Sequence, residues 1–195
     1  MKAILLLATL KEKGPSNTAV LSEFAVGYLE KQGIECETIR LAGHTIVPGT
    51  YIKMDTPDDF PALYDKILGS DIVLFATPIW WNSHSSLLQR IIERLDEVFD
   101  IINQGKPSPL EGKLGGMIIT GDSDGVEHLT GNIANFFCSL GITVPAYASL
   151  GVIYEGHAKG KRTAKATLLK HYKKEYAKHA ESMAKSFYKL ASAGK

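Results

Sequence analysis

Short apolar runs alternate with amphipathic helical patterns along this chain, and Gly, Pro, Asp or Ser residues separate them. Such an alternation is typical of parallel strands joined by crossover helices, because a sheet covered on both faces needs apolar side chains on both sides of each strand. We therefore expect an α/β fold with one parallel sheet and helices on both faces. The expected strands are residues 2–8, 35–40, 72–77, 116–120 and 146–152.

Five helices are expected in the intervals, from apolar positions spaced three and four residues apart. The first begins near Asn17 and stops at Gly33, and the second starts behind Pro61, where Asp58 and Asp59 favour its dipole. The remaining three patterns cover residues 87–99, 133–140 and 163–190. Residues 42–57 show no period, so we expect a long irregular excursion there, of a kind that is usually functional or disordered.

Composition limits the setting. A chain of 195 residues with 45% hydrophobic content can bury a sizeable core, so residues 1–195 are expected to form one domain. A net charge of +1 gives no field that would attract nucleic acid. Cys36 and Cys138 lie far apart, and neither a signal peptide nor a long apolar span is visible, so we expect a cytoplasmic protein with no membrane partner.

Residues 9–18 lie between the first strand and the first helix, and this position predicts an anion site. The first N–H groups of a helix have no partner within it and carry the positive end of its dipole. Ser16, Asn17 and Thr18 could add hydroxyl and amide donors. Neither a Walker spacing nor a G-x-G-x-x-G motif is present, which favours a phosphomonoester over a nucleotide. The alternative is that Ser16 only caps the helix.

The loops after the first, third and fourth strands should converge, because ligands in an open parallel sheet bind beyond the carboxyl ends of the strands. Residues 77–83 carry two adjacent tryptophans, and an exposed pair of this kind indicates an interface or a flat ligand. Residues 120–125 carry two glycines that would let backbone N–H groups approach a ligand. A buried Trp pair and an ordinary turn are the alternatives.

These blocks make the sequence resemble the flavodoxin-like NAD(P)H-dependent FMN reductase and quinone reductase family over nearly the whole chain. The segment Ser16-Asn17-Thr18, with Thr9 ahead of it, resembles the family's phosphate loop. Residues 71–81 resemble its segment D-hydrophobic-A-T-P-hydrophobic-Tyr-Trp, and residues 112–113 followed by 118–121 complete the likeness. The resemblance implies a doubly wound, five-stranded sheet in the order 2-1-3-4-5, FMN as cofactor and NAD(P)H as electron donor.

The resemblance also implies which residues contact FMN. They are Thr9, Ser16, Asn17, Thr18, Thr77, Pro78, Ile79, Trp80, Trp81, Asn82, Thr120, Gly121, Asp122 and Gly125. The chain departs from the family at Trp80, where tyrosine is usual. Residues 42–57 lack the cysteine cluster of the family's iron–sulfur relatives, so no iron–sulfur centre or other metal is expected.

The resulting hypothesis is an FMN-dependent oxidoreductase that passes hydride from NAD(P)H to a flat acceptor, such as a quinone, flavin or azo compound, in a two-step exchange. The cofactor supplies the chemistry, so no protein group is expected to act as a catalytic acid or base. One alternative is a flavodoxin-type electron carrier, although such carriers are typically acidic. Another is a flavin-free interaction protein. An open isoalloxazine ring would favour a homodimer or homotetramer.

The six histidines show no metal-ligand spacing. His84 and His128 lie beside the predicted loops and could touch flavin or substrate, whereas His171 and His179 are expected at the surface. Basic residues near the last helix could meet the extra phosphate of NADPH, but solvation is the simpler expectation for them, and we leave them outside the site: Lys159, Lys161 and Arg162.

Overall fold

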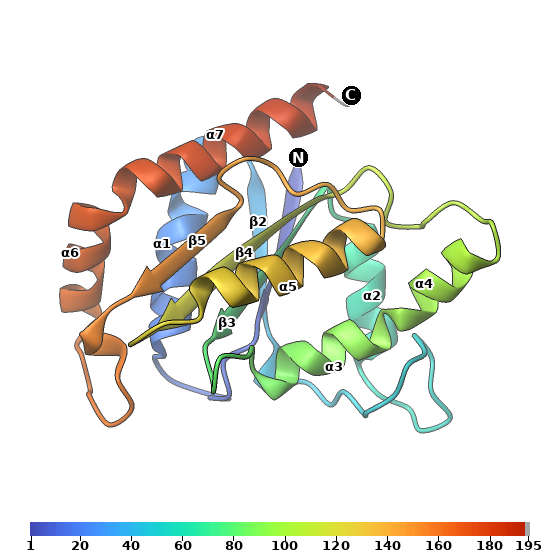
Figure 1. Cartoon of the computed structure of the whole chain (residues 1–195), viewed down its shortest axis with the longest axis horizontal. Helices are drawn as coiled ribbons and strands as arrows, with labels where there is room; N and C mark the ends of the chain where they lie inside the picture. The colour runs from blue at the N-terminus through green and yellow to red at the C-terminus, as the bar shows by residue number, and fades with distance from the viewer. Residues whose placement is uncertain (194–195) are drawn as a thin grey trace.

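A computed structural model describes residues 1–193 of the chain. Its five strands are β1 (Lys2–Leu7), β2 (Glu35–Arg40), β3 (Ile72–Pro78), β4 (Leu114–Gly121) and β5 (Ser149–Ile153). They form one parallel sheet in the order β2-β1-β3-β4-β5, in which Leu5 of β1 pairs with Thr38 of β2 and Leu74 of β3 (Figure 1). The predicted fold class and strand order are confirmed.

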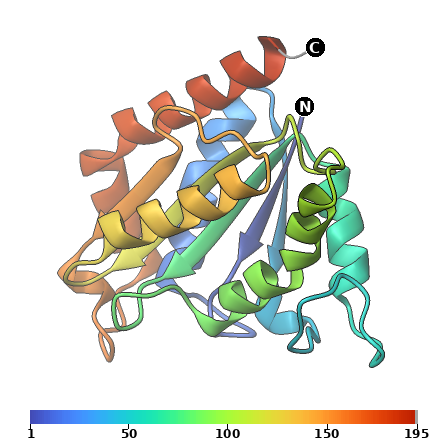
Figure 2. The same cartoon turned by 45° about the vertical axis from the view of Figure 1, so that its right-hand side comes forward.

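Helices cover both faces of this sheet, as expected. They are α1 (Asn17–Lys31), α2 (Phe60–Leu68), α3 (Ser86–Arg94), α4 (Asp96–Asn103), α5 (Val126–Ser139), α6 (Lys165–Glu175) and α7 (Ala177–Ala193), with short 3-10 turns η1 (Leu41–Gly43) and η2 (Glu155–His157). Helices α1, α6 and α7 share one apolar cluster with the sheet, and α2 to α5 share the other. Figures 1 and 2 show α3 and α5 in front of the sheet and α1 behind it.

Two adjacent glycines of β4 let helices pack closely on both faces of the sheet. A Cβ atom at Gly115 would lie 2.6 Å from the ring of Phe137 in α5. One at Gly116 would lie 2.6 Å from the ring of Phe187 in α7. The helices therefore approach the centre of the sheet more closely than a strand with larger side chains would allow.

The prediction of one helix over residues 87–99 is wrong. The helix breaks at Leu95, and α4 starts a new helix at Asp96. The apolar repeat continues through the break, so the apolar pattern of the sequence did not reveal it. Asp96 and Glu97 stand in the first turn of α4, where carboxylates favour a helix N-terminus, and this charge pattern was the available signal.

The prediction of one helix over residues 163–190 is also wrong, because Tyr176 separates α6 from α7. Residues 1–193 thus hold seven α-helices instead of five. The fifth strand begins at Ser149 and not at residue 146, since Tyr147 has a φ of 62°, which a strand does not accommodate. The fourth begins earlier than predicted, at Leu114.

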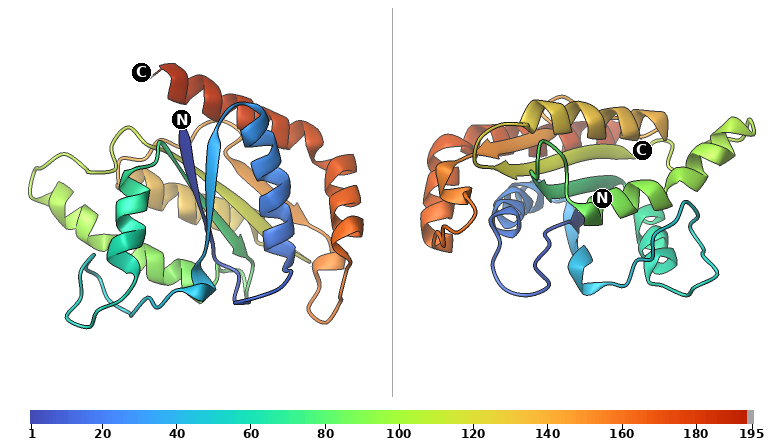
Figure 3. Two further views of the ribbon diagram at one scale, coloured as in Figure 1. Left: turned by 180° about the vertical axis from the view of Figure 1, so that it is seen from behind. Right: turned by 60° about the horizontal axis from the view of Figure 1, so that its bottom comes forward.

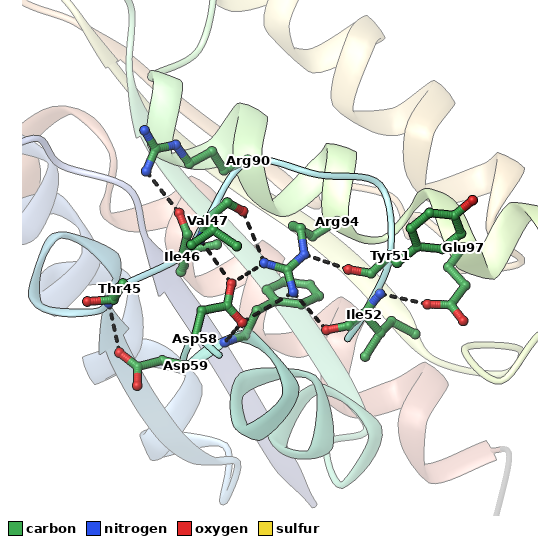
Figure 4. A network of polar contacts seen from close by, with 11 residues as sticks. Thr45, Ile46, Val47, Tyr51, Ile52, Asp58, Asp59, Arg90, Arg94 and Glu97 are labelled. Atoms are coloured by element: carbon green, nitrogen blue, oxygen red, sulfur yellow. Dashed lines mark hydrogen bonds and ion pairs between the residues drawn. The ribbon is translucent and has the colours of Figure 1, made fainter. Parts of the chain in front are cut away.

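The irregular excursion is confirmed between η1 and α2, and an arginine of α3 holds it in place (Figure 4). Arg94 donates to the carbonyls of Val47 (3.0 Å), Tyr51 (2.5 Å) and Ile52 (2.8 Å) and pairs with the carboxylate of Asp58. Burial alone would raise the pKa of Asp58, but its hydrogen bonds to Arg94 and to the Val47 N–H keep that pKa below its ordinary value. A single buried cation therefore organises a segment that lacks regular structure.

Candidate functional site

A cavity of about 880 Å³ opens beyond the carboxyl ends of the strands. This volume falls in the range typical of small-molecule sites. The loops after β1, β3 and β5 extend beyond the same end of the sheet (Figure 3). All the predicted site residues except Thr77 and Gly125 line the cavity: Thr9, Ser16, Asn17, Thr18, Pro78, Ile79, Trp80, Trp81, Asn82, Thr120, Gly121 and Asp122.

The N-terminus of α1 forms one end of the cavity. Ser16 is the N-cap, and its Oγ accepts a hydrogen bond from the Ala19 N–H at 3.0 Å, so the capping interpretation is confirmed. The Val20 N–H donates to the Ser16 carbonyl, also at 3.0 Å. The N–H groups of Asn17 and Thr18 have no partner within the helix, and residues 1–193 give them no other acceptor. Two first-turn donors are therefore free for an anion.

Hydroxyl groups surround these donors. The Oγ1 atoms of Thr18 and Thr120 lie 2.7 Å apart, both buried, and join α1 to the end of β4. Each hydroxyl has one proton, and the hydrogen bond between Thr18 and Thr120 uses only one of the two. The other proton can be donated to a ligand. Ser16 likewise uses an oxygen lone pair in its cap and keeps its proton free.

The loop after β1 is fixed from the neighbouring strand. Arg40, the last residue of β2, donates through Nη1 to the carbonyls of Lys11 (3.0 Å) and Gly14 (3.1 Å). Gly14 has a φ of 77°, a conformation that favours glycine. The loop therefore has a defined path into α1 before any ligand binds.

The loop after β3 forms a tight turn at the cavity mouth. The N–H of Trp80 donates to the carbonyl of Ser83 at 2.8 Å, and the N–H of Ser83 donates back to Trp80 at 2.9 Å. Between them Trp81 and Asn82 both have positive φ angles, of 49° and 57°. Trp80 is 39% exposed and Trp81 is 99% exposed, so the prediction of exposed tryptophans is confirmed.

Thr77 anchors this turn from behind and does not line the cavity. Its buried Oγ1 accepts from the Ser85 N–H at 3.0 Å, and Ser85 Oγ donates to the carbonyl of Ala8 at 2.7 Å. The contact of Thr77 with FMN was expected from the family motif, but in this chain its hydroxyl faces the protein. Its role is to tie the turn to β1 and β3.

Gly121, at the end of β4, and Gly125, which follows the strand, give space to protein side chains. A Cβ atom at Gly121 would lie 2.6 Å from Cδ1 of Ile79, and one at Gly125 would lie 2.7 Å from Oδ1 of Asn82. Gly125 therefore makes room for the turn after β3 and does not line the cavity. The side chains of Asp122 and Asp124 are exposed.

A fourth segment, residues 157–161 after β5, lines the cavity and was missed. His157 bonds through Nδ1 to the carbonyl of Gly121 (3.0 Å) and through Nε2 to the hydroxyl of Tyr172 (2.7 Å). Its own carbonyl accepts from Nδ2 of Asn17 at 3.1 Å. Burial lowers the pKa of His157, which favours the neutral ring. This residue thus connects α1, β4 and α6 beneath the cavity.

Lys159 and Lys161 are exposed, as expected, but they also line the cavity, so leaving them outside the site was wrong. Nζ of Lys159 lies 5.9 Å from the centre of the Trp80 ring. Their segment follows the carboxyl end of the fifth strand, where ligands of an open parallel sheet also bind, and that position was the available signal.

The other histidines lie outside the cavity. His171 was expected at the surface but is partly buried, with its ring stacked on Tyr154 at a centroid distance of 4.0 Å. His179 is exposed, as expected. His84 and His128 do not line the cavity. Over residues 1–193 the structure has no group of three or more His, Cys, Asp or Glu side chains that could hold a metal ion.

Residues 1–154 match the family described as NADPH-dependent FMN reductase. The chain belongs to this family. Membership confirms the resemblance found in the sequence and supports FMN as cofactor, with NAD(P)H as the electron donor. In the part of the chain that the structure describes, no helix combines the length and the apolar character needed to cross a membrane.

Two curated proteins are similar over most of the chain. The "8-demethyl-8-aminoriboflavin-5'-phosphate synthase" of Streptomyces davaonensis is 33% identical over 159 residues, which are 76% of this chain and 62% of that protein. The "Divalent metal cation transporter MntH" of Mycobacterium bovis is 34% identical over 160 residues, which are 80% of this chain and 23% of that protein. The chain thus spans less than two thirds of the length of either relative.

Solved structures share the fold. The structure of RosB with bound 8-demethyl-8-formylriboflavin-5'-phosphate superposes with a TM-score of 0.80 and 26% identity, over 99% of this chain and 79% of that one. An archaeal flavodoxin superposes with a TM-score of 0.58 and 14% identity, over 98% of this chain and 99% of that one. The second likeness supports the flavodoxin-like fold alone.

Proposed function

We propose that this chain binds FMN in the cavity and acts as an NAD(P)H-dependent oxidoreductase. The observation that carries the proposal is that Asn17 and Thr18, whose N–H groups are free, line the same cavity as the aromatic ring of Trp80. One end of the cavity thus suits a phosphomonoester, and the other suits a flat aromatic ring. The donor set of backbone N–H groups and neutral hydroxyls fits the phosphate of FMN.

Each part of the cavity has a role in this proposal. The hydroxyls of Ser16 and Thr18 hold the phosphate, and residues 78–80 border the ring. FMN, when bound, supplies a site that accepts hydride from reduced nicotinamide and returns the electrons to a second substrate. With FMN bound, the protein would hold the ring in one orientation, and donor and acceptor would use the same place in turn.

We infer a planar acceptor, such as a quinone, a flavin or an azo compound. The named product of the Streptomyces relative and the ligand of RosB are both riboflavin 5'-phosphates, which supports recognition of a flavin phosphate here. These names also favour a second candidate, in which the flavin phosphate is itself the substrate. A flavodoxin-type carrier is the remaining alternative, and the net charge of +1 does not suit its docking on basic partners.

The test is to add FMN to the purified protein and to follow NADH and NADPH oxidation with quinone, flavin and azo acceptors. We expect a yellow protein that oxidises a reduced nicotinamide when a planar acceptor is present. A yellow but inert protein would indicate the carrier, and a protein that ignores FMN would contradict the proposal. Mass spectrometry of the recovered flavin separates an enzyme that uses FMN as a cofactor from one that converts the flavin phosphate as its substrate. A cofactor returns with unchanged mass.

We also propose that the protein forms a homodimer or homotetramer. Tyr51 and Phe99 present apolar surface to solvent in the isolated chain, with relative exposures of 55% and 41%. Light scattering coupled to size exclusion measures the assembly directly. A monomer at micromolar concentration would contradict this part of the proposal.

A further inference from the structure

We propose that Trp81 is held in a strained turn so that its indole stacks on the planar electron acceptor and not on FMN. This inference rests on the proposed function and adds a residue that selects the acceptor. It follows from three observations: the backbone conformation of Trp81, the fixed position of its turn and the exposure of its ring.

The backbone conformation is unfavourable for tryptophan. The φ angles of 49° at Trp81 and 57° at Asn82, with the paired bonds between Trp80 and Ser83, describe a two-residue turn with both central residues in the left-handed region. Turns of this kind favour Asn and Gly at these positions. Asn82 suits its position, but a bulky side chain at a positive φ is an outlier.

The surrounding structure keeps the turn from relaxing. The Ile79 N–H donates to the carbonyl of Thr120 at 2.8 Å on one side of it. On the other side, Ser85 is bonded to Thr77 and Ala8. Asn82 packs against Gly125, which has no side chain to displace it. The conformation of Trp81 is therefore imposed by its neighbours, and such imposed outliers cluster at functional sites.

The indole of Trp81 makes almost no compensating contact within the chain, because the residue is 99% exposed. Trp80 differs, since it is 39% exposed and has Lys159 near its ring. Trp81 lines the cavity and is the more exposed of its two tryptophans, so its ring remains accessible to a second ligand. A rigid aromatic plane at that place suits a flat aromatic acceptor.

The decisive variants are Trp81→Asn, which tolerates the backbone conformation but lacks the ring, and Trp81→Phe, which keeps an aromatic plane. For each variant we measure the melting temperature of the FMN-free protein, the FMN affinity and the oligomeric state. We also measure KM for a planar quinone and for ferricyanide. We expect Trp81→Asn to raise the melting temperature by about 2–4 °C, as relief of strain would in a domain of this size. Its KM for the quinone should rise about tenfold, while FMN affinity and ferricyanide reduction change less than twofold. Trp81→Phe should restore most of the quinone affinity.

Tyr147 provides a matched control, because it is also an exposed aromatic residue at positive φ (62°, 62% exposed) but does not line the cavity. Tyr147→Asn should raise the melting temperature and leave both KM values unchanged. The inference is overturned if Trp81→Asn has no selective effect on the quinone, if it weakens FMN binding, or if it dissociates an oligomer without changing KM. A wild-type protein that binds no FMN overturns the proposed function, and this inference with it.

Discussion

Arg94 of α3 and Asp58, just ahead of α2, form an ion pair whose side chains are 0% and 1% exposed. The Arg94 guanidinium also lies 4.6 Å from the ring centre of Phe60, the first residue of α2. Because the same guanidinium binds three carbonyls of the excursion, the pair connects two helices to a segment without regular structure (Figure 4). Removing one partner of such a pair leaves an uncompensated buried charge.

We predict that Asp58→Asn lowers the free energy of unfolding by about 3–5 kcal/mol, the usual cost of breaking a buried pair on one side. Urea denaturation measures this change. Glu37→Gln, which removes one partner of the exposed Lys66–Glu37 pair, is the control and should cost no more than about 1 kcal/mol. Equal, small losses in the two variants would show that the buried pair does not hold the excursion.

His157 gives the protein a specific pH dependence. Burial lowers the pKa of its ring in the folded state, so near the ordinary value of 6.5 the unfolded chain binds more protons than the folded one. The stability associated with His157 is therefore fully present above pH 6.5 and is lost as the pH falls toward its folded pKa.

We predict that His157→Gln flattens the dependence of unfolding free energy on pH between about pH 7 and pH 5. Denaturation curves at several pH values measure the slope. His128→Gln, at an exposed position outside the cavity, should keep the wild-type slope. If His157→Gln keeps it as well, the neutral buried ring is not the source of the effect.

Gly116 is predicted to be irreplaceable for packing. In Gly116→Ala the added methyl group would meet the ring of Phe187 at 2.6 Å and the backbone carbonyl of Ala148 at 2.9 Å, so we expect a loss of about 1–3 kcal/mol. Gly131→Ala, inside α5 with open space around it, should instead gain about 0.5–1 kcal/mol. Thermal denaturation measures the stability of both variants against the wild type. A Gly116→Ala protein as stable as the wild type would contradict the close packing.

The centre of the sheet could be predicted from the sequence because β1, β3 and β4 are apolar runs buried on both faces. The edge strand β2 is largely exposed and carries no such run. The helix break at Tyr176 could not be predicted, because the apolar repeat passes through it. The apolar repeat also passes through Leu95, where only the acidic first turn of α4 marks the break. Arg94 was also missed. A lone arginine on a helix normally indicates exposure, and its carbonyl partners lie more than 40 residues away in a segment with no pattern.

The part of the site that could be predicted is the set of loops that directly follow strand ends. Ser16 and Thr18 lie where the helix N-terminus must be, so sequence order alone places them. Thr77 has the expected position in the chain, but its hydroxyl faces Ser85, and only the three-dimensional path of the loop decides this direction. The contribution of His157 depends on how η2 folds back under β4, which no local pattern indicates.

The central claim is that the N-terminus of α1 binds the phosphate of FMN, and a comparison of FMN with riboflavin, which lacks that phosphate, tests it. Two charge-assisted hydrogen bonds contribute roughly 1.5–3 kcal/mol each, so the wild type should bind FMN at least about 100-fold more tightly than riboflavin. Ser16→Ala combined with Thr18→Ala should weaken FMN binding and leave riboflavin binding unchanged. Thr130→Ala is the control, since Thr130 forms a similar hydroxyl pair with Ser149 (2.9 Å) away from the cavity. Equal affinity of the wild type for FMN and riboflavin, or unchanged FMN affinity in the double variant, would contradict the account.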